Sequence, residues 1–204
     1  MSSFPQTRLT SLPGRALRQA VAMTRIISGT YGGRRLRVPS GGTTRPTSDR
    51  AREGLYSSLL SLLDLDGADV LDLYAGSGAL GLEALSRGAG RATLVEKDSM
   101  ALAALRANVR ALELSAEVVD EAVEDFLSGP PSSYDLVIMD PPYDLHVDPV
   151  LTAVLPWLAP EAVVVVERRT SGAHPAWPEG LEGVRSRRYG EATLHYARAA
   201  GTTP

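Results

Sequence analysis

The sequence has 204 residues, of which 44% are hydrophobic and 22% charged, a composition that allows one α/β domain with its own core and excludes a disordered or fibrous chain. It contains no cysteine, which excludes disulfide frameworks, thiolate zinc sites and a cysteine nucleophile. No apolar segment approaches the roughly 20 residues needed to cross a bilayer, and no secretion signal is recognisable, so we expect a cytoplasmic protein without a membrane partner.

The net charge of −3 is unevenly distributed along the chain. Residues 1–52 contain ten arginines and one acidic residue, Asp49, which gives +9, whereas the remaining 152 residues contain 11 basic and 23 acidic residues, which gives −12. A basic segment joined to an acidic body is typical of a protein that contacts a polyanion such as a nucleic acid. The alternative is a solvated basic tail.

The N-terminal part divides into two segments. Residues 1–22 show no periodicity, and a regular pattern begins only at Met23, so we interpret 1–22 as a disordered or non-native extension. Two short strands flank a glycine-rich turn between residues 24 and 38 and predict a basic hairpin, or arm, over 23–47. The second strand alternates apolar residues with arginines, so one of its faces is cationic.

Residues 48–204 show the pattern of one α/β domain. After an amphipathic helix that runs to about Leu63, strands are expected at 70–74, 92–96, 117–119, 134–139, 162–167, 184–189 and 193–198, and helices at 79–87, 98–112 and 149–158. This alternation, with strongly apolar strands, indicates a largely parallel sheet that helices cover on both faces. The short last connection indicates that the final two strands are antiparallel to each other.

A glycine-rich turn follows the first strand of this domain. Residues 76–81 read GSGALG, and Gly76 and Gly78 would let backbone N–H groups approach a ligand at a helix start. Glu96 ends the next strand, 20 residues after Gly76, where a carboxylate can accept hydrogen bonds from both hydroxyls of a ribose. These features predict an adenosine-type cofactor and leave NAD and S-adenosylmethionine (SAM) both possible.

The strand at 134–139 ends in the motif DPPY, residues 140–143. The Asp140 carboxylate and the Pro141 carbonyl can accept both protons of an exocyclic amine, which turns the nitrogen lone pair toward an electrophile. Tyr143 offers a ring face on which a base can stack, worth roughly 1–3 kcal/mol. The motif therefore favours SAM over NAD, and we predict Asp140, Pro141 and Tyr143 as the catalytic residues.

The DPPY motif resembles the corresponding motif of SAM-dependent methyltransferases that modify exocyclic amines. Over about residues 24–198, the chain is similar to the RsmD-type 16S ribosomal RNA (guanine-N2)-methyltransferases. The segments that carry the similarity are 25–29, 33–36, 45–53, 71–78, 95–96 and 140–143. The resemblance implies a Rossmann-like class I methyltransferase sheet of seven strands, the last antiparallel, after a small N-terminal β-hairpin. It also implies methyl transfer from SAM to N2 of one guanine in 16S rRNA within an assembling small ribosomal subunit.

The resemblance also assigns roles to residues. It places Gly76 and Gly78 beside the methionine part of SAM, with Asp72 nearby, Glu96 at the ribose hydroxyls, and Glu121 and Ala122 at the adenine edge. The predicted RNA-binding residues are Arg25, Arg34, Arg35, Arg37, Arg45 and Arg50. For residues 49–52 the alternative is a local ion pair of small value.

Three other functions remain open. A DNA adenine-N6 methyltransferase would share the DPPY motif, an NAD-dependent oxidoreductase would leave that motif without a role, and a non-catalytic RNA-binding module would need none of this chemistry. No metal site is expected, because His146, His174 and His195 lie far apart in the sequence and lack ligand spacing. We expect a monomer.

Overall fold

The structure is a computed structural model that describes residues 23–39 and 49–201. The predicted extension at 1–22, the last part of the predicted arm and the candidate Arg45 lie outside the described residues. None of the helices within the two described ranges is long and apolar enough to span a bilayer.

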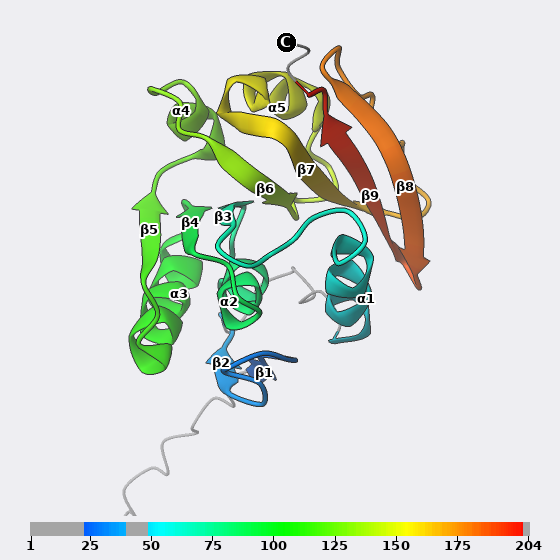
Figure 1. The fold of residues 1–204 in the computed structure, drawn as a ribbon. Coiled ribbons are helices and arrows are strands. Elements are labelled where there is room, and N and C mark those ends of the chain that lie inside the picture. Colours follow the sequence, from blue (N-terminus) through cyan, green and yellow to red (C-terminus); the bar gives the residue numbers. More distant parts are fainter. Residues whose placement is uncertain (1–22, 40–48, 202–204) are drawn as a thin grey trace, which may run out of the picture.

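Seven strands form the central sheet, in the order β5-β4-β3-β6-β7-β9-β8 (Figure 1). Their bounds are β3 Asp69–Leu73, β4 Arg91–Glu96, β5 Ala116–Asp120, β6 Tyr134–Met139, β7 Leu158–Arg169, β8 Leu181–Tyr189 and β9 Ala192–Ala199. Strands β3 to β7 pair in parallel, and β9 lies between β7 and β8, antiparallel to both. The predicted seven-stranded sheet with an antiparallel last strand is confirmed.

Helices cover both faces of the sheet, as predicted. The first face carries α1 (Asp49–Leu59), α2 (Ala79–Ser86) and α3 (Ser99–Leu112), and the second carries α4 (Val123–Leu127) and α5 (Asp148–Ala153) (Figure 1). Each helical layer has its own core because successive strand residues point to opposite faces of the sheet. In β3, Val70 packs under the first layer, and Leu71 and Leu73 pack under the second.

Some predicted boundaries were wrong. The helix expected at 149–158 ends at Ala153 and is followed by a 3-10 turn at Leu155–Trp157, because Pro156 cannot continue the α-helical hydrogen bonding. Helix α4 was not predicted, since five residues are too short to show a helical period. Strand β7 has 12 residues and extends beyond the predicted 162–167 at both ends. Its C-terminal end therefore carries Arg168 and Arg169, which lie outside the predicted strand.

The N-terminal hairpin pairs β1 (Met23–Arg25) with β2 (Arg35–Arg37) and is anchored to the body (Figure 1). The buried Glu83 of α2 accepts hydrogen bonds from the N–H groups of Ile27 (2.6 Å) and Ser28 (3.0 Å). Asn108 of α3 accepts from the Arg37 N–H (2.8 Å) and donates to the carbonyls of Arg37 and Ser77 (both 2.9 Å). One amide therefore joins the hairpin to the loop that follows β3.

Candidate active site

The carboxyl ends of β3, β4 and β6 meet at one edge of the sheet. Asp72 pairs with Leu94 of β4 on one side and with Ile138 of β6 on the other, so the loops that follow the three strands are neighbours. Asp72 precedes the end of β3, Glu96 ends β4 and Asp140 directly follows β6, so the three carboxylates are at the same edge. Such an edge, next to the central strand, is where ligands bind in sheets of this type.

The loop after β3, residues 74–78, is called the glycine loop here. It contains three residues with positive φ: Tyr74 (64°), Gly76 (56°) and Gly78 (79°). At Gly78 the positive φ would strain any other residue, and a Cβ atom there would also lie 2.4 Å from Leu105 Cδ1, so glycine is strongly favoured. Tyr74 holds a left-handed conformation that is costly for a tyrosine, and such strain concentrates at functional sites.

Glu96 connects the glycine loop to the end of β4. Its Oε2 accepts a hydrogen bond from the Gly76 N–H (2.8 Å), and its Oε1 accepts from the N–H groups of Lys97 and Asp98 (2.8 Å each). Three of the roughly four lone-pair sites of the carboxylate are therefore occupied, which leaves one, on Oε2, for a ribose hydroxyl. The side chain was predicted as a ligand group only, and the structure shows that it also holds the loop in place.

Asp72 is buried below the glycine loop. Its Oδ2 accepts from the Gly81 N–H (2.8 Å), whereas its Oδ1 has no hydrogen-bond partner in the described part of the chain. Burial raises the pKa of Asp72 to about 7; the nearby Asp140 and Glu96 add to this, and the Gly81 N–H opposes it. A ligand ammonium group would supply both the missing donor and the compensating charge, so this carboxylate fits the amino group of SAM.

Residues 140–143, which are predicted to hold the base, form the loop after β6 and are called the base-holding loop here. Pro141 is buried, whereas Pro142 is exposed and Tyr143 is 40% exposed. The loop therefore faces solvent, next to the glycine loop at the ends of the paired strands β3 and β6. The Pro142 carbonyl accepts a hydrogen bond from the Leu145 N–H (3.0 Å), which closes the turn.

Side chains at the end of β7 contact this loop. The Arg168 guanidinium donates to the carbonyls of Tyr143 (2.9 Å, from Nη2) and Pro142 (3.4 Å, from Nη1). The Tyr143 hydroxyl donates to Glu167 (3.4 Å), and the Arg169 guanidinium lies 5.0 Å from the Tyr143 ring centroid. These three residues were not predicted from the sequence. The pattern that could have indicated them is the charged run ERR, which ends an apolar strand at the same edge of the sheet.

The predicted adenine-edge residues lie at the same edge of the sheet. Glu121 and Ala122 follow β5, whose last residue, Asp120, pairs with Glu96. Ala122 is the N-cap of α4, and Glu124 of that helix accepts a hydrogen bond from the Tyr74 hydroxyl (3.5 Å).

Most of the predicted RNA-binding arginines are exposed. Arg34, Arg35 and Arg37 lie on the hairpin with their side chains in solvent, as does Arg50 at the start of α1. Arg25 differs, because it forms an ion pair with Asp49 (3.2 Å).

Asp49 connects the hairpin to α1. It also contacts Arg52 (2.8 Å), a fully buried residue whose Nη2 donates to Thr24 of β1 as well. Burial acts to raise the pKa of Asp49, but the guanidinium groups of Arg52 and Arg25 outweigh it and lower this pKa. The local ion pair that was the alternative for residues 49–52 is therefore present, and Asp49 and Arg52 also connect β1 to α1.

Two of the three histidines, distant in the sequence, are neighbours in the fold. The rings of His174 and His195 lie 4.9 Å apart, and His195 Nδ1 is 2.9 Å from the Ser186 hydroxyl. Burial, with smaller contributions from the nearby His174 and Arg168, lowers the pKa of His195 to about 4. Among the described residues, no group of three or more His, Cys, Asp or Glu side chains could hold a metal ion.

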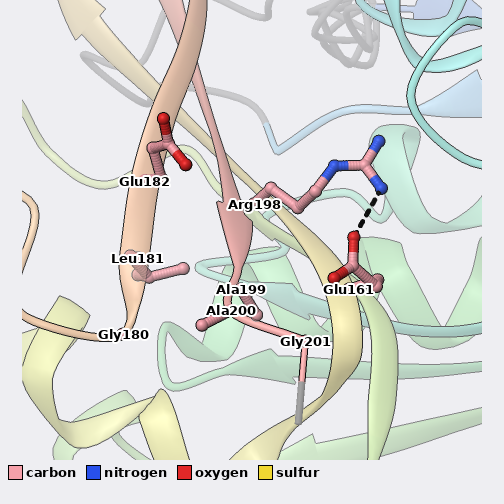
Figure 2. Close-up of a pocket in the computed structure, with 8 residues that line it drawn as sticks. All are labelled: Glu161, Gly180, Leu181, Glu182, Arg198, Ala199, Ala200 and Gly201. Carbon is pink, nitrogen blue, oxygen red and sulfur yellow. Dashed lines mark hydrogen bonds and ion pairs between the residues drawn. The ribbon is translucent and has the colours of Figure 1, made fainter. Parts of the chain in front are cut away.

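A cavity of about 330 Å³ lies at the opposite edge of the sheet (Figure 2). It is lined by the starts of β7 and β8 and the end of β9, and an ion pair between Glu161 and Arg198 (3.2 Å) spans part of its wall. Because β6 and β7 are parallel, the start of β7 is far from the loop that follows β6. This cavity is therefore separate from the candidate site.

Comparisons with known proteins identify the family. A family model described as "Conserved hypothetical protein 95" matches residues 24–198. The "Ribosomal RNA small subunit methyltransferase D" of Escherichia coli (strain K12) is 40% identical over 158 residues, which is 76% of this chain and 79% of the relative. The protein of the same name from Haemophilus influenzae is 37% identical over 151 residues, 70% of this chain and 77% of the relative.

The chain belongs to the RsmD-type methyltransferase family. A solved structure described as a putative methyltransferase from Escherichia coli superposes with a TM-score of 0.79 at 33% identity and covers 88% of this chain and 99% of that one. A 16S rRNA N2 methyltransferase of Thermus thermophilus, solved with AdoMet and guanosine, has a TM-score of 0.62 at 20% identity over 88% of this chain and 50% of that one, a likeness of fold alone. As an RsmD-type methyltransferase, the protein uses SAM, as predicted.

Proposed function

We propose that this protein transfers a methyl group from SAM to the exocyclic N2 amine of one guanine in 16S ribosomal RNA. The observation that carries the proposal is the placement of the base-holding loop beside the glycine loop, at the ends of the paired strands β3 and β6. The RNA substrate is supported by relatives at 40% and 37% identity that are named rRNA small subunit methyltransferases.

The residues of the cofactor side would act as follows. Gly76 and Gly78 let the backbone approach the methionine part, and the unpartnered Oδ1 of Asp72 accepts from its ammonium group. Glu96 would accept from the ribose hydroxyls, one at the Oε2 lone pair that the three backbone N–H groups leave available and the other in place of one of those N–H groups. Glu121 and Ala122 would read the adenine edge. When bound, SAM supplies an electrophilic methyl group on a positively charged sulfur.

The residues of the base side would orient the guanine. Tyr143 stacks on the base after it leaves the RNA stack, which offsets an unstacking cost of a few kcal/mol. The Asp140 carboxylate and the Pro141 carbonyl accept the two N2 protons and aim the nitrogen lone pair. The carboxylate stabilises the positive charge that develops on nitrogen and then takes the surplus proton, so alignment and electrostatics supply most of the acceleration.

The hairpin would bind the RNA backbone. The exposed Arg34, Arg35 and Arg37, with Arg50 and the ion-paired Arg25, present positive charge, and Arg45 belongs to the same proposed set although it lies outside the described residues. In this proposal 23–47 is the RNA-contacting arm and 48–204 the catalytic domain of a cytoplasmic monomer that acts on an assembling small subunit. A DNA adenine-N6 methyltransferase is not favoured, because the named relatives are rRNA enzymes.

The proposal is tested by methylation with radiolabelled SAM. The substrates are small-subunit particles that lack the mark, naked 16S rRNA and duplex DNA, and the modified base is then mapped. We expect label on N2 of a single guanine in 16S rRNA and none on DNA. Label on adenine N6 of DNA, or no transfer to either RNA substrate, would contradict the proposal.

The role of Asp140 is tested by Asp140→Ala. Without the carboxylate, the amine is neither oriented nor stabilised, so we expect methyl transfer to fall below detection while the Kd for SAM stays within a few-fold of wild type. Asp144→Ala is the matched control, since this exposed aspartate lies four residues further along the chain. Near-normal turnover by Asp140→Ala would refute the assigned role.

A further inference from the structure

We infer that residues 167–169, at the end of β7, position the base-holding loop for methyl transfer, with Arg168 as the main positioning residue. The inference rests on the proposed function, because it takes residues 140–143 as the part that holds the guanine. It concerns a different strand, whose three charged side chains contact the loop.

Arg168 is a buried cation whose hydrogen bonds go to the base-holding loop. The residue is only 8% exposed, and it donates to the Tyr143 carbonyl (2.9 Å) and the Pro142 carbonyl (3.4 Å). In the parts of the chain that the structure describes, it forms no ion pair with a carboxylate. A buried guanidinium is costly unless its N–H groups form hydrogen bonds. The two loop carbonyls supply acceptors for the guanidinium of Arg168.

The strand that carries Arg168 is a rigid support. The parallel pairing of β6 with β7 ends at Met139 and Val166, where β6 itself ends. Strand β7 continues for three more residues because β9 holds its other side, with Arg168 opposite Thr193 and Arg169 opposite Ala192. The base-holding loop therefore lies against a strand end that the sheet has already fixed.

The neighbours of Arg168 hold the Tyr143 side chain. Glu167 and Arg169 project from one face of β7 and Arg168 from the other, because side chains alternate along a strand. Glu167 accepts from the Tyr143 hydroxyl (3.4 Å), and the Arg169 guanidinium covers the ring at 5.0 Å from its centroid. With a cation over one face of the ring, the opposite face is left for one base.

When Arg168 holds the carbonyls of Pro142 and Tyr143, it also limits the movement of the preceding residues that would bind the guanine amine. Pro141 and Pro142 have φ angles set by their rings, so the loop has few remaining torsions once the carbonyls of residues 142 and 143 are held. The Pro141 carbonyl and Asp140 then keep one orientation. Because a misplacement of about 1 Å can cost about 100-fold in rate, the contacts of Arg168 affect the rate of transfer more than binding.

The test compares Arg168→Met and Arg168→Lys with wild type and with Arg110→Met, which removes an exposed arginine at the end of α3. The single-turnover rate of methylation of small-subunit particles is measured at saturating SAM, together with the KM for particles and the Kd for SAM. We expect Arg168→Met to lower the rate about 100-fold with both binding constants within about threefold. Arg168→Lys should recover part of the rate, because an ammonium group can reach one carbonyl.

A second measurement does not depend on activity. Hydrogen–deuterium exchange of the peptide that contains residues 140–147 should be faster in Arg168→Met than in wild type and Arg110→Met, at unchanged SAM affinity. A rate within twofold of wild type, unchanged exchange, or a parallel loss of SAM binding in both Arg168 variants would overturn the inference. Inactive wild-type protein would count against the proposed function instead, and exchange would still test the positioning role.

Discussion

Single side chains at the carboxyl edge of the sheet combine a structural role with a chemical one. Glu96 accepts hydrogen bonds from three backbone N–H groups and is also the residue proposed to bind a ribose hydroxyl. Asp72 accepts from the Gly81 N–H that lies under the glycine loop, and its second oxygen is unpartnered among the described residues. A substitution of Asp72 or Glu96 is therefore expected to affect both the backbone that the side chain holds and the binding of SAM, and the two effects are measured separately.

Asp72 makes the stability of the cofactor-free protein depend on pH. The folded protein binds this proton more tightly than the unfolded chain, whose aspartate titrates near 3.8, so the free energy of unfolding falls as the pH rises toward about 7. Asp72→Asn keeps an acceptor for the Gly81 N–H and removes the titration. We expect its melting temperature to exceed that of wild type by several degrees at pH 8 and by little at pH 4.

The same variant should lose affinity for SAM, because its amide carries no charge for the ammonium group. Thermal unfolding from pH 4 to pH 8, without and with SAM, measures both effects. Asp144→Asn serves as the control and should follow the wild-type curve. A constant difference between Asp72→Asn and wild type at all pH values would contradict this account.

Individual site residues were predictable where a motif and a strand end coincide. Asp72, Glu96 and Asp140 each lie in or directly after an apolar strand, so the parallel topology alone brings them to one edge. Arg168 and Glu83 were not predictable, because their partners are backbone groups 26 and 56 residues away. No local pattern records such contacts.

The hairpin depends on helix α2 for its position. Glu83 is fully buried and accepts from Ile27, Ser28 and the Arg87 side chain (2.7 Å). Glu83→Ala leaves the two N–H groups without an acceptor and removes one of the two carboxylates that Arg87 contacts, so we expect a loss of about 3–5 kcal/mol in the free energy of unfolding. Urea denaturation measures it, with the exposed Glu179→Ala as the control. A loss below about 1 kcal/mol would show that the hairpin is held by other contacts.

The cationic face of the hairpin predicts how RNA affinity responds to salt. Five arginine–phosphate contacts with single-stranded RNA would lower the affinity roughly 100-fold between 50 and 200 mM salt. Replacing both Arg34 and Arg35 by Gln should reduce the slope of log affinity against log salt by about 1.4, since each contact contributes about 0.7. Filter binding measures the slopes, with Arg110→Gln as the control. Equal slopes for the double variant and wild type would exclude these two contacts.

The elements themselves were largely predictable from the period of apolar residues. The seven strands of the sheet and helices α2 and α3 lie within a few residues of their expected positions. Helix α1 ends at Leu59 rather than near Leu63, and β7 is longer than its apolar run because pairing with β9 extends it. Tertiary contacts decide where an element ends, and the local pattern does not contain them.

The order of the last strands required more than local pattern. The short connection predicts that β8 and β9 pair, but β7 could adjoin either of them. The resemblance to the family implied only that the last strand is antiparallel, and the structure shows that β9 lies inside the sheet and β8 at its edge. In the whole molecule, this arrangement supports the end of β7 on the side away from the base-holding loop.

Binding of SAM should stabilise the whole molecule. At a SAM concentration 100 times its Kd, mass action adds about 2.7 kcal/mol to the free energy of unfolding. For a protein of this size each kcal/mol raises the melting temperature by about 2–4 °C, so we expect a shift of about 5–10 °C. Thermal unfolding with NAD at the same concentration is the control and should show no shift. A shift with NAD and none with SAM would reverse the choice of cofactor.

The three hydrogen bonds of Asn108 restrict which residues its position tolerates. The side chain must offer one acceptor and two donor hydrogens at fixed places, toward both backbone groups of Arg37 and toward the Ser77 carbonyl. Aspartate offers the acceptor but no donor hydrogens, leucine offers neither acceptor nor donor, and glutamine is one methylene too long. A library that randomises this codon should return asparagine almost exclusively under selection for folded protein.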